Sequence, residues 1–286
     1  SEGNTIPKIL TENYKFFNGG IIFQSNDKLK SKEIPQSKLI ANHPEYLSYI
    51  GKYPVIFIDF KNTKVNNFKQ MKIKIKEEMI KTLRNFEYLS KINSPYFETT
   101  FSQEYSRLLR NAKSGNITSI IENLSSLLYK YHNEKVWILI DEYDAAANEA
   151  LLNFKDEEKA KLVLKLFREI FEPALKGNIN LERSVLTGVQ YIVQSGMLSG
   201  LNNLKKYNVS NPKYSKYYGI DTEELNPLLN HFKIDNNRRS KLKDWYNGYL
   251  LNCGTDENPF FIEKYNIWSI VNYFDDQPSG FISYWT

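Results

Sequence analysis

Three short apolar runs, separated by longer helical patterns, constrain the fold of this chain more than any other feature. The runs are Pro54–Phe60, Lys135–Glu142 and Arg183–Gly188, and each contains β-branched residues and is bounded by polar residues, Pro or Gly. Such runs predict strands that are buried on both faces of a sheet. Because helical segments alternate with them, an α/β fold with a mainly parallel sheet is favoured.

Amphipathic patterns predict the helices that flank this sheet. In the segment 69–92, Ile75, Met79 and Leu83 recur at gaps of four and place one apolar stripe on a helix. Similar spacings predict helices at about 102–112, 117–131 and 156–176.

The pattern changes after about residue 205, where no further long strand is expected. Short helices are predicted from Thr222, as the N-cap, and at about 238–247 and 266–274. Gly248 is predicted to be a helix C-cap in the left-handed conformation. We therefore expect a core domain at 1–205 and a smaller, mostly helical domain at 206–286.

The composition excludes several classes of protein. The single cysteine, Cys253, excludes an internal disulfide and a cysteine-based zinc site, and the three histidines lie far apart. The longest apolar runs are far shorter than the roughly 18 residues that span a membrane. The segment Ser1–Leu10 lacks the pattern of a signal peptide. These features favour an intracellular, cytoplasmic protein without a membrane partner.

Two acids, Asp141 and Glu142, follow four apolar residues and make a Walker-B pattern. In open α/β sheets, ligands bind outside the carboxyl ends of the strands. In a nucleoside triphosphatase, an Asp at this position helps to hold Mg²⁺ and a following Glu can polarise the attacking water. Asp144 follows two positions after Glu142 in the sequence. From the pattern alone, a solvated strand end or a helix cap is an equal alternative.

The next strand end carries Thr187 and Gln190. A polar side chain on the strand beside the Walker-B strand can sense the terminal phosphate of a nucleotide, and Thr187 is placed to do so. Taken alone, a Thr that satisfies its own turn is the simpler interpretation.

Seven segments, in order, resemble the AAA-ATPase-like proteins, which often carry a C-terminal nuclease-like domain of the PD-(D/E)XK type. The segments are Tyr53–Lys61, Ile138–Ala145, Val185–Gln190, Ser199–Leu204, Trp245–Tyr249, Tyr265–Ile270 and Tyr284–Trp285. The resemblance implies a P-loop NTPase-like core, with a mainly parallel sheet flanked by helices, and a helical C-terminal part. It implies Mg²⁺ and ATP as cofactors, with Asp141 on the metal, Glu142 activating water, Thr187 sensing the γ-phosphate, and Asp144 and Gln190 supporting the site.

The chain also departs from the family. No Gly-x-x-x-x-Gly-Lys-Ser/Thr loop occurs in it, and Tyr191, Ala146 and Ile267 stand where the family usually has Arg, Pro and Pro. The missing Walker-A loop supplies charge-assisted hydrogen bonds of roughly 1.5–3 kcal/mol each. Without four or five of them, ATP binding would weaken by about 6 kcal/mol, or at least about four decades. We therefore expect a hydrolase in the intact protein and an inactive segment here.

An alternative is a degenerate ATPase fold that binds protein or nucleic acid, which Tyr191 and the mild net charge of +5 permit. Without the Walker-A strand one sheet edge should be exposed. Ile21–Phe23, another chain, a second copy or residues outside this sequence could cover it. Asp59 and Lys61 have the spacing of a nuclease half-site, a weaker interpretation. The stretch Tyr207–Tyr218 could stack bases, but domain packing explains it more simply.

Overall fold

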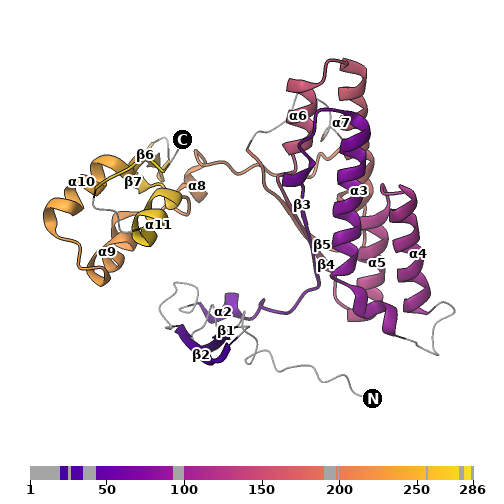
Figure 1. Cartoon of the computed structure of the whole chain (residues 1–286), viewed down its shortest axis with the longest axis horizontal. Helices are drawn as coiled ribbons and strands as arrows, with labels where there is room; N and C mark the ends of the chain where they lie inside the picture. The colour runs from indigo at the N-terminus through magenta and orange to yellow at the C-terminus, as the bar shows by residue number, and fades with distance from the viewer. Residues whose placement is uncertain are drawn as a thin grey trace. The chain divides into compact units, whose positions relative to one another are not determined.

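The chain divides into two compact units, Ser1–Asn203 and Leu204–Thr286 (Figure 1). The computed structural model describes residues 20–24, 27–34, 43–92, 100–189, 198, 200–255, 257–276 and 280–284, with backbone alone for 20–34, Pro44 and Leu47. Each unit has its own buried core.

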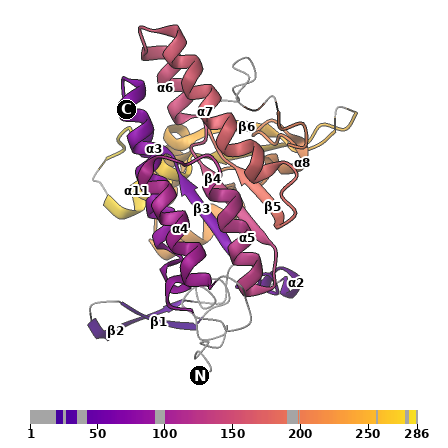
Figure 2. The ribbon, with the colours of Figure 1, turned by 90° about the vertical axis from the view of Figure 1, so that its right-hand side faces the viewer.

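The first unit is built around a three-stranded parallel sheet of order β3-β4-β5. The strands are β3 (Val55–Asp59), β4 (Val136–Asp141) and β5 (Leu181–Leu186). The flanking helices are α3 (Phe68–Arg84), α4 (Phe101–Ser114), α5 (Ile120–His132), α6 (Ala145–Asn153) and α7 (Glu157–Leu175), with short 3-10 turns η3 (Lys61–Thr63) and η4 (Glu87–Lys91). The predicted α/β fold is confirmed (Figure 2).

The helices pack against the strands through apolar stripes. α3 contacts β3, α5 contacts β4 and α7 contacts β5. Where β3 ends, Phe60 is fully buried, and its ring centroid lies 5.1 Å from that of Phe167 and 6.0 Å from that of Phe171 on α7. Edge-to-face packing of this kind fixes the end of β3 beside α7.

β3 is buried on one face and exposed on the other, β4 alternates between buried and half-buried residues, and β5 contains no fully buried residue. Ile56 and Ile58 are 0% and 1% exposed, whereas Val55 and Phe57, on the opposite face of β3, are 44% and 51% exposed. The prediction that the strands are buried on both faces is therefore wrong for β3 and for β5. The alternation of buried and exposed residues along β3 cannot be seen in the sequence, because the residues of the exposed face are apolar as well.

The N-terminal hairpin is separate from this sheet. β1 (Gly20–Gln24) pairs antiparallel with β2 (Asp27–Ile34), and a short helix, α2 (Pro44–Leu47), follows. The suggestion that Ile21–Phe23 covers the edge of the core sheet is wrong, because in the part of the chain that the structure describes β1 pairs with β2 and with no strand of the core sheet. Within the described residues, β5 pairs only with β4, so its other edge is open.

The second unit contains helices and a β-hairpin. The elements are α8 (Pro212–Ser215), α9 (Thr222–His231), α10 (Asn236–Tyr246), β6 (Asn247–Asn252), β7 (Phe261–Tyr265) and α11 (Ile267–Asp276). β6 and β7 pair antiparallel and form a short hairpin in a region where the sequence predicts helices and no long strand. A core of Leu225, Leu242, Tyr246, Ile270 and other apolar residues lies between the helices and the hairpin.

Two predicted caps in this unit are wrong. The N-cap of α9 is Asp221 and not Thr222, because the Asp221 carboxylate accepts from the Glu224 N–H while the Glu224 carboxylate accepts from the Asp221 N–H. This reciprocal capping box satisfies two backbone donors. Gly248 has no left-handed backbone, since α10 ends at Tyr246 and the chain continues directly into β6.

Among the residues that the structure describes, no helix is both long enough and apolar enough to cross a membrane.

Candidate functional site

The carboxyl ends of the three parallel strands meet at one edge of the sheet. Asp59 and Asp141 are register partners, and the Phe60 N–H donates to the Asp141 carbonyl at 3.1 Å. On the other side of β4, the Thr187 N–H donates to the Ile140 carbonyl at 2.8 Å. The pairing therefore continues to the last residue of each strand and fixes the backbone from which the predicted site residues project.

Asp141 and Thr187 are in direct contact. The Thr187 hydroxyl donates to Oδ1 of Asp141, and the same oxygen accepts from the Glu142 N–H at 3.0 Å. Asp141 is half-buried and Thr187 is exposed. The structure thus places a carboxylate and a hydroxyl side by side at a solvent-accessible strand end.

Glu142 turns away from the strand direction in a left-handed backbone conformation, with φ of 52°. A non-glycine residue adopts this conformation at a cost of roughly 1–2 kcal/mol. Such strain is concentrated at functional sites. The turn brings Oε2 of Glu142 to 3.6 Å from Nζ of Lys64, which follows η3. Both side chains remain partly in solvent, so this ion pair orients Glu142 more than it stabilises the fold.

Asp144 lies beneath this edge and is 1% exposed. Its Oδ2 accepts from the side-chain amide of Asn148 on α6 at 2.9 Å. The strand end at Gly188 packs so closely that an added Cβ would lie 2.3 Å from Oδ1 of Asp144 and 2.8 Å from Cε1 of Tyr143. Tyr143 in turn donates its N–H to the Thr187 carbonyl at 3.1 Å. Asp144 is therefore a buried support of the loop and does not face the solvent with Asp141.

The predictions for Gln190 and for the spacing of Asp59 and Lys61 have different outcomes. Gln190 lies outside the described residues. The Asp59 carboxylate accepts from the Lys61 N–H at 2.7 Å, so the Asp-x-Lys spacing forms a local turn at the start of η3. That contact gives the spacing a structural role and lends no support to a nuclease half-site.

The oxygen groups at this edge suit magnesium. Within the described part of the chain, no three His, Cys, Asp or Glu side chains converge to hold a metal ion. Mg²⁺, however, usually takes one or two carboxylates and completes its shell with waters and substrate phosphates. The Asp141 carboxylate beside the Thr187 hydroxyl fits a metal that arrives with a nucleotide, and not one held by protein alone.

A comparison with protein families finds that the model described as Predicted AAA-ATPase matches residues 20–198, more than half of the chain. The chain belongs to this predicted AAA-ATPase family. The matched region contains all three strands of the parallel sheet and Asp141, Glu142 and Thr187. Searches of curated proteins and of solved structures each found no significant match.

Sequence reasoning missed three residues of this AAA-ATPase-like edge: Lys64, Tyr143 and Gly188. Lys64 is 78 positions from Glu142 and gave no local signal, as an exposed lysine in a lysine-rich chain. Tyr143 acts through its backbone, which no side-chain pattern reveals. Gly188 could have been found, because a glycine at the end of a buried strand often marks a close approach of other atoms.

Proposed function

We propose that the strand ends of β4 and β5 form the magnesium and phosphate side of an ATPase site. The observation that carries this proposal is the contact between the Thr187 hydroxyl and the Asp141 carboxylate, with Glu142 turned out at the same edge. Membership of the predicted AAA-ATPase family supports it. The carboxyl edge of a parallel sheet is also where α/β proteins bind ligands.

Each residue has a role that follows from its chemistry. Asp141 would hold Mg²⁺, which when bound neutralises charge on the nucleotide phosphates. Glu142 would orient the attacking water and accept its proton at a carboxylate oxygen. Thr187 can donate its hydroxyl proton to a γ-phosphate oxygen in place of Asp141. Asp144 keeps the loop in place from below, and Gln190 is proposed as a neighbour of the phosphate.

Lys64 influences the position of the Glu142 carboxylate. Its ammonium is 3.6 Å from Oε2 of Glu142, and the pair is accessible to solvent. The ion pair draws Glu142 toward η3, so the anionic phosphates of an arriving nucleotide would compete with Glu142 for Lys64.

The phosphate loop is the part that this segment does not supply. No Walker-A sequence occurs in residues 1–286. The open edge of β5 and the exposed apolar face with Val55 and Phe57 support the proposal that further polypeptide completes the sheet. Isothermal titration of the 286-residue chain with Mg-ATP should show millimolar or weaker affinity. Micromolar affinity would contradict this account.

Glu142→Gln tests the chemistry in a protein that carries a Walker-A loop ahead of this segment. The amide cannot accept the proton of the water, so ATP turnover should fall by at least about 100-fold. ATP affinity should stay within about threefold. Glu158→Gln, an exposed acid on α7, is the matched control and should leave turnover unchanged. Unchanged turnover in Glu142→Gln would remove Glu142 from the mechanism.

A second candidate is an ATPase fold kept as a binding module without turnover. The observation that favours it is Tyr191, which stands where the family usually has Arg. An arginine that stabilises the transition state of phosphoryl transfer contributes orders of magnitude in rate. Tyr191→Arg discriminates the two candidates in the intact protein. A large gain in turnover favours the module, and no gain with existing turnover favours the enzyme.

A further inference from the structure

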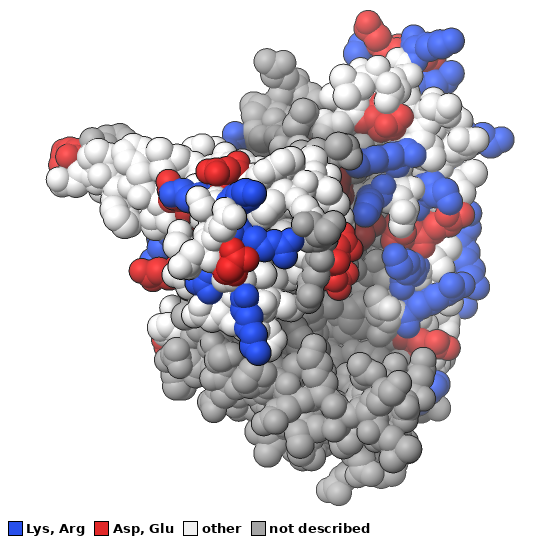
Figure 3. Space-filling view, turned by 60° about the vertical axis from the view of Figure 1, so that its left-hand side comes forward, with Lys and Arg blue, Asp and Glu red and all other residues white. Residues whose placement is uncertain are grey.

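The start of the second unit combines tyrosines and lysines and contains no acid. Between residues 205 and 218 there are four lysines and four tyrosines. No Asp or Glu occurs anywhere from Arg183 to Ile220, although the whole chain is nearly balanced, with 38 basic and 33 acidic residues. In Figure 3, Lys and Arg are interspersed with Asp and Glu over the described part of the visible face.

Three of the four tyrosines in this segment are exposed. Tyr207, Tyr217 and Tyr218 are 49%, 71% and 41% exposed. The edge of one ring packs on the face of another in the Tyr207–Tyr214 pair, whose centroids are 4.3 Å apart. An exposed tyrosine is ordinary by itself, but here three exposed tyrosines occur within twelve positions of the chain, 207–218.

The lysines lie beside these rings. Nζ of Lys213 is 5.4 Å from the centroid of Tyr214, and Nζ of Lys216 is 4.9 Å from that of Tyr217. A hydrogen bond from Tyr207, with Lys213 and Lys205 nearby, lowers the pKa of Tyr214. Lys216 therefore lies beside the exposed ring of Tyr217, and Lys213 beside the half-buried ring of Tyr214, which packs on Tyr207.

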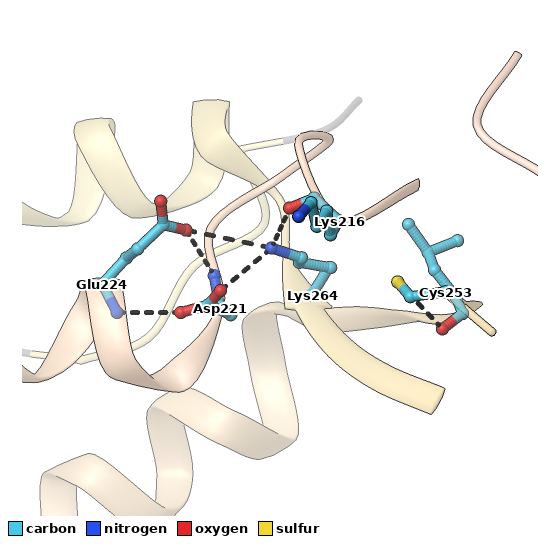
Figure 4. A network of polar contacts seen from close by, with 6 residues as sticks. Lys216, Asp221, Glu224, Cys253 and Lys264 are labelled. Carbon is cyan, nitrogen blue, oxygen red and sulfur yellow. Dashed lines mark hydrogen bonds and ion pairs between the residues drawn. The ribbon is translucent and has the colours of Figure 1, made fainter. Parts of the chain in front are cut away.

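Buried polar contacts hold the backbone of this segment in place. Ser215 is fully buried, and its hydroxyl bonds to the carbonyls of Val209 and Asn211 at 2.8 and 2.7 Å. The Lys264 ammonium, 1% exposed, donates to the Lys216 carbonyl at 2.7 Å and to Oδ2 of Asp221 at 3.1 Å (Figure 4). Burying a lysine is unfavourable unless it is paired, so these contacts specify one conformation of the segment.

We propose that this aromatic and basic surface docks a single strand of nucleic acid. Its members are Tyr207, Tyr217 and Tyr218, with Lys205, Lys206, Lys213 and Lys216. Exposed rings offer faces on which unpaired bases stack, and the lysines neutralise the phosphates between those bases. In a duplex the base faces are already stacked, so a single strand is the occupant that uses both parts of the surface.

The surface contacts base faces and phosphates only, and binding should therefore tolerate any sequence. Nothing in the proposal depends on the nucleotide site, because every residue of the surface lies in the second unit. It assigns this chain a polynucleotide ligand in addition to its proposed nucleotide.

Fluorescence anisotropy of the full 286-residue chain with labelled 15-mers of thymidine and of uridine tests the proposal. Both oligomers should bind within about threefold of each other, and a blunt duplex should bind at least tenfold more weakly. For a single strand, log K falls with log salt by about 0.7 per neutralised phosphate, so four lysines predict a slope of about −3.

Double variants distinguish the contribution of the tyrosine rings to binding from that of the lysine charges. Tyr217→Ala with Tyr218→Ala should weaken binding by about 100-fold, because each stacked base contributes about tenfold. The same two positions changed to Phe should bind within about threefold of wild type. Lys213→Gln with Lys216→Gln should reduce the salt slope to about −1.5. Tyr249→Ala with Lys241→Gln, both exposed in the same unit, is the matched control and should change neither quantity.

Photocross-linking with iodinated thymidine oligomers gives a readout that does not depend on variants. The proposal expects cross-links at Tyr207, Tyr217 or Tyr218. Cross-links confined to other segments, equal binding of the duplex, or no binding of either single strand would each overturn it. Failure to bind oligomers while the chain still binds a protein partner through these rings would assign the surface to a protein instead.

Discussion

The Thr187 hydroxyl donates a hydrogen bond to Oδ1 of Asp141 and so joins the ends of β5 and β4. The contact links residues 46 positions apart, and the Thr187 N–H adds a backbone bond to Ile140. A hydroxyl held in this way is positioned before any ligand arrives. The geometry of the proposed site therefore follows from parallel strand pairing and not from a mobile loop.

The close packing of Gly188 predicts that Gly188→Ala destabilises the fold. The added methyl would lie 2.3 Å from Oδ1 of Asp144, a buried residue with little room to move. Overpacking of this kind costs about 1–3 kcal/mol in the free energy of unfolding, which urea denaturation measures.

The matched control is Gly248→Ala, because no heavy atom lies within 4 Å of the added methyl and φ is not left-handed. Its free energy of unfolding should equal that of wild type within about 0.5 kcal/mol. Equal stability of the two variants would mean that the space between Gly188 and Asp144 can hold a methyl group.

The left-handed backbone of Glu142 predicts that glycine is more stable than alanine at this position. Glu142→Gly and Glu142→Ala both remove the carboxylate, but only glycine adopts φ of 52° without strain. Glu142→Gly should therefore be about 1 kcal/mol more stable than Glu142→Ala. Urea denaturation of both variants measures the difference, and an alanine variant as stable as the glycine variant would show that the residue is not strained.

Much of the first unit follows from the sequence, because its signals are local. The apolar runs of β3, β4 and β5 and the helical periodicity of α4, α5 and α7 correctly predict these elements. The acids at the end of β4 and Thr187 at the end of β5 come together because parallel strands end at one edge. The exposed face of β3 could not be predicted, since Val55 and Phe57 are as apolar as their buried neighbours.

The second unit shows where local signals fail. β6 and β7 are short, and their pairing depends on contacts between distant positions such as Asn252 and Phe261. The sequence does not distinguish Asp221 from Thr222 as the N-cap of α9, because both residue types are good caps. Lys264 gave no signal, because burial and pairing with Asp221 are tertiary properties.

The capping box of α9 predicts that acid destabilises the chain. Burial disfavours the charged form of Asp221, but hydrogen bonds from the Glu224 N–H and the Lys264 ammonium outweigh it and lower the pKa of Asp221. The folded state therefore favours the carboxylate. Its stabilisation is complete above the ordinary pKa of 3.8 and is lost as the pH falls through the lowered value.

Asp221→Asn keeps a good cap but removes the charge beside buried Lys264. It should lower the free energy of unfolding at pH 7 by about 1–2 kcal/mol and should reduce the loss of stability below pH 4. Urea denaturation followed by tryptophan fluorescence measures both. Asp244→Asn, an exposed acid on α10, is the control. An unchanged acid dependence in Asp221→Asn would assign the effect to other carboxylates.

Paramagnetic broadening by Mn²⁺ in isotope-labelled chain tests most directly whether the acids at the end of β4 hold the metal of a nucleotide. Mn²⁺ replaces Mg²⁺ on oxygen ligands and broadens nearby amide signals even when binding is weak. With Mn²⁺ and ATP, the account predicts selective broadening at Asp141, Glu142 and Thr187 that disappears in Asp141→Asn. Broadening spread evenly over exposed acids, such as Glu157 and Glu158, and unaffected by Asp141→Asn would contradict it.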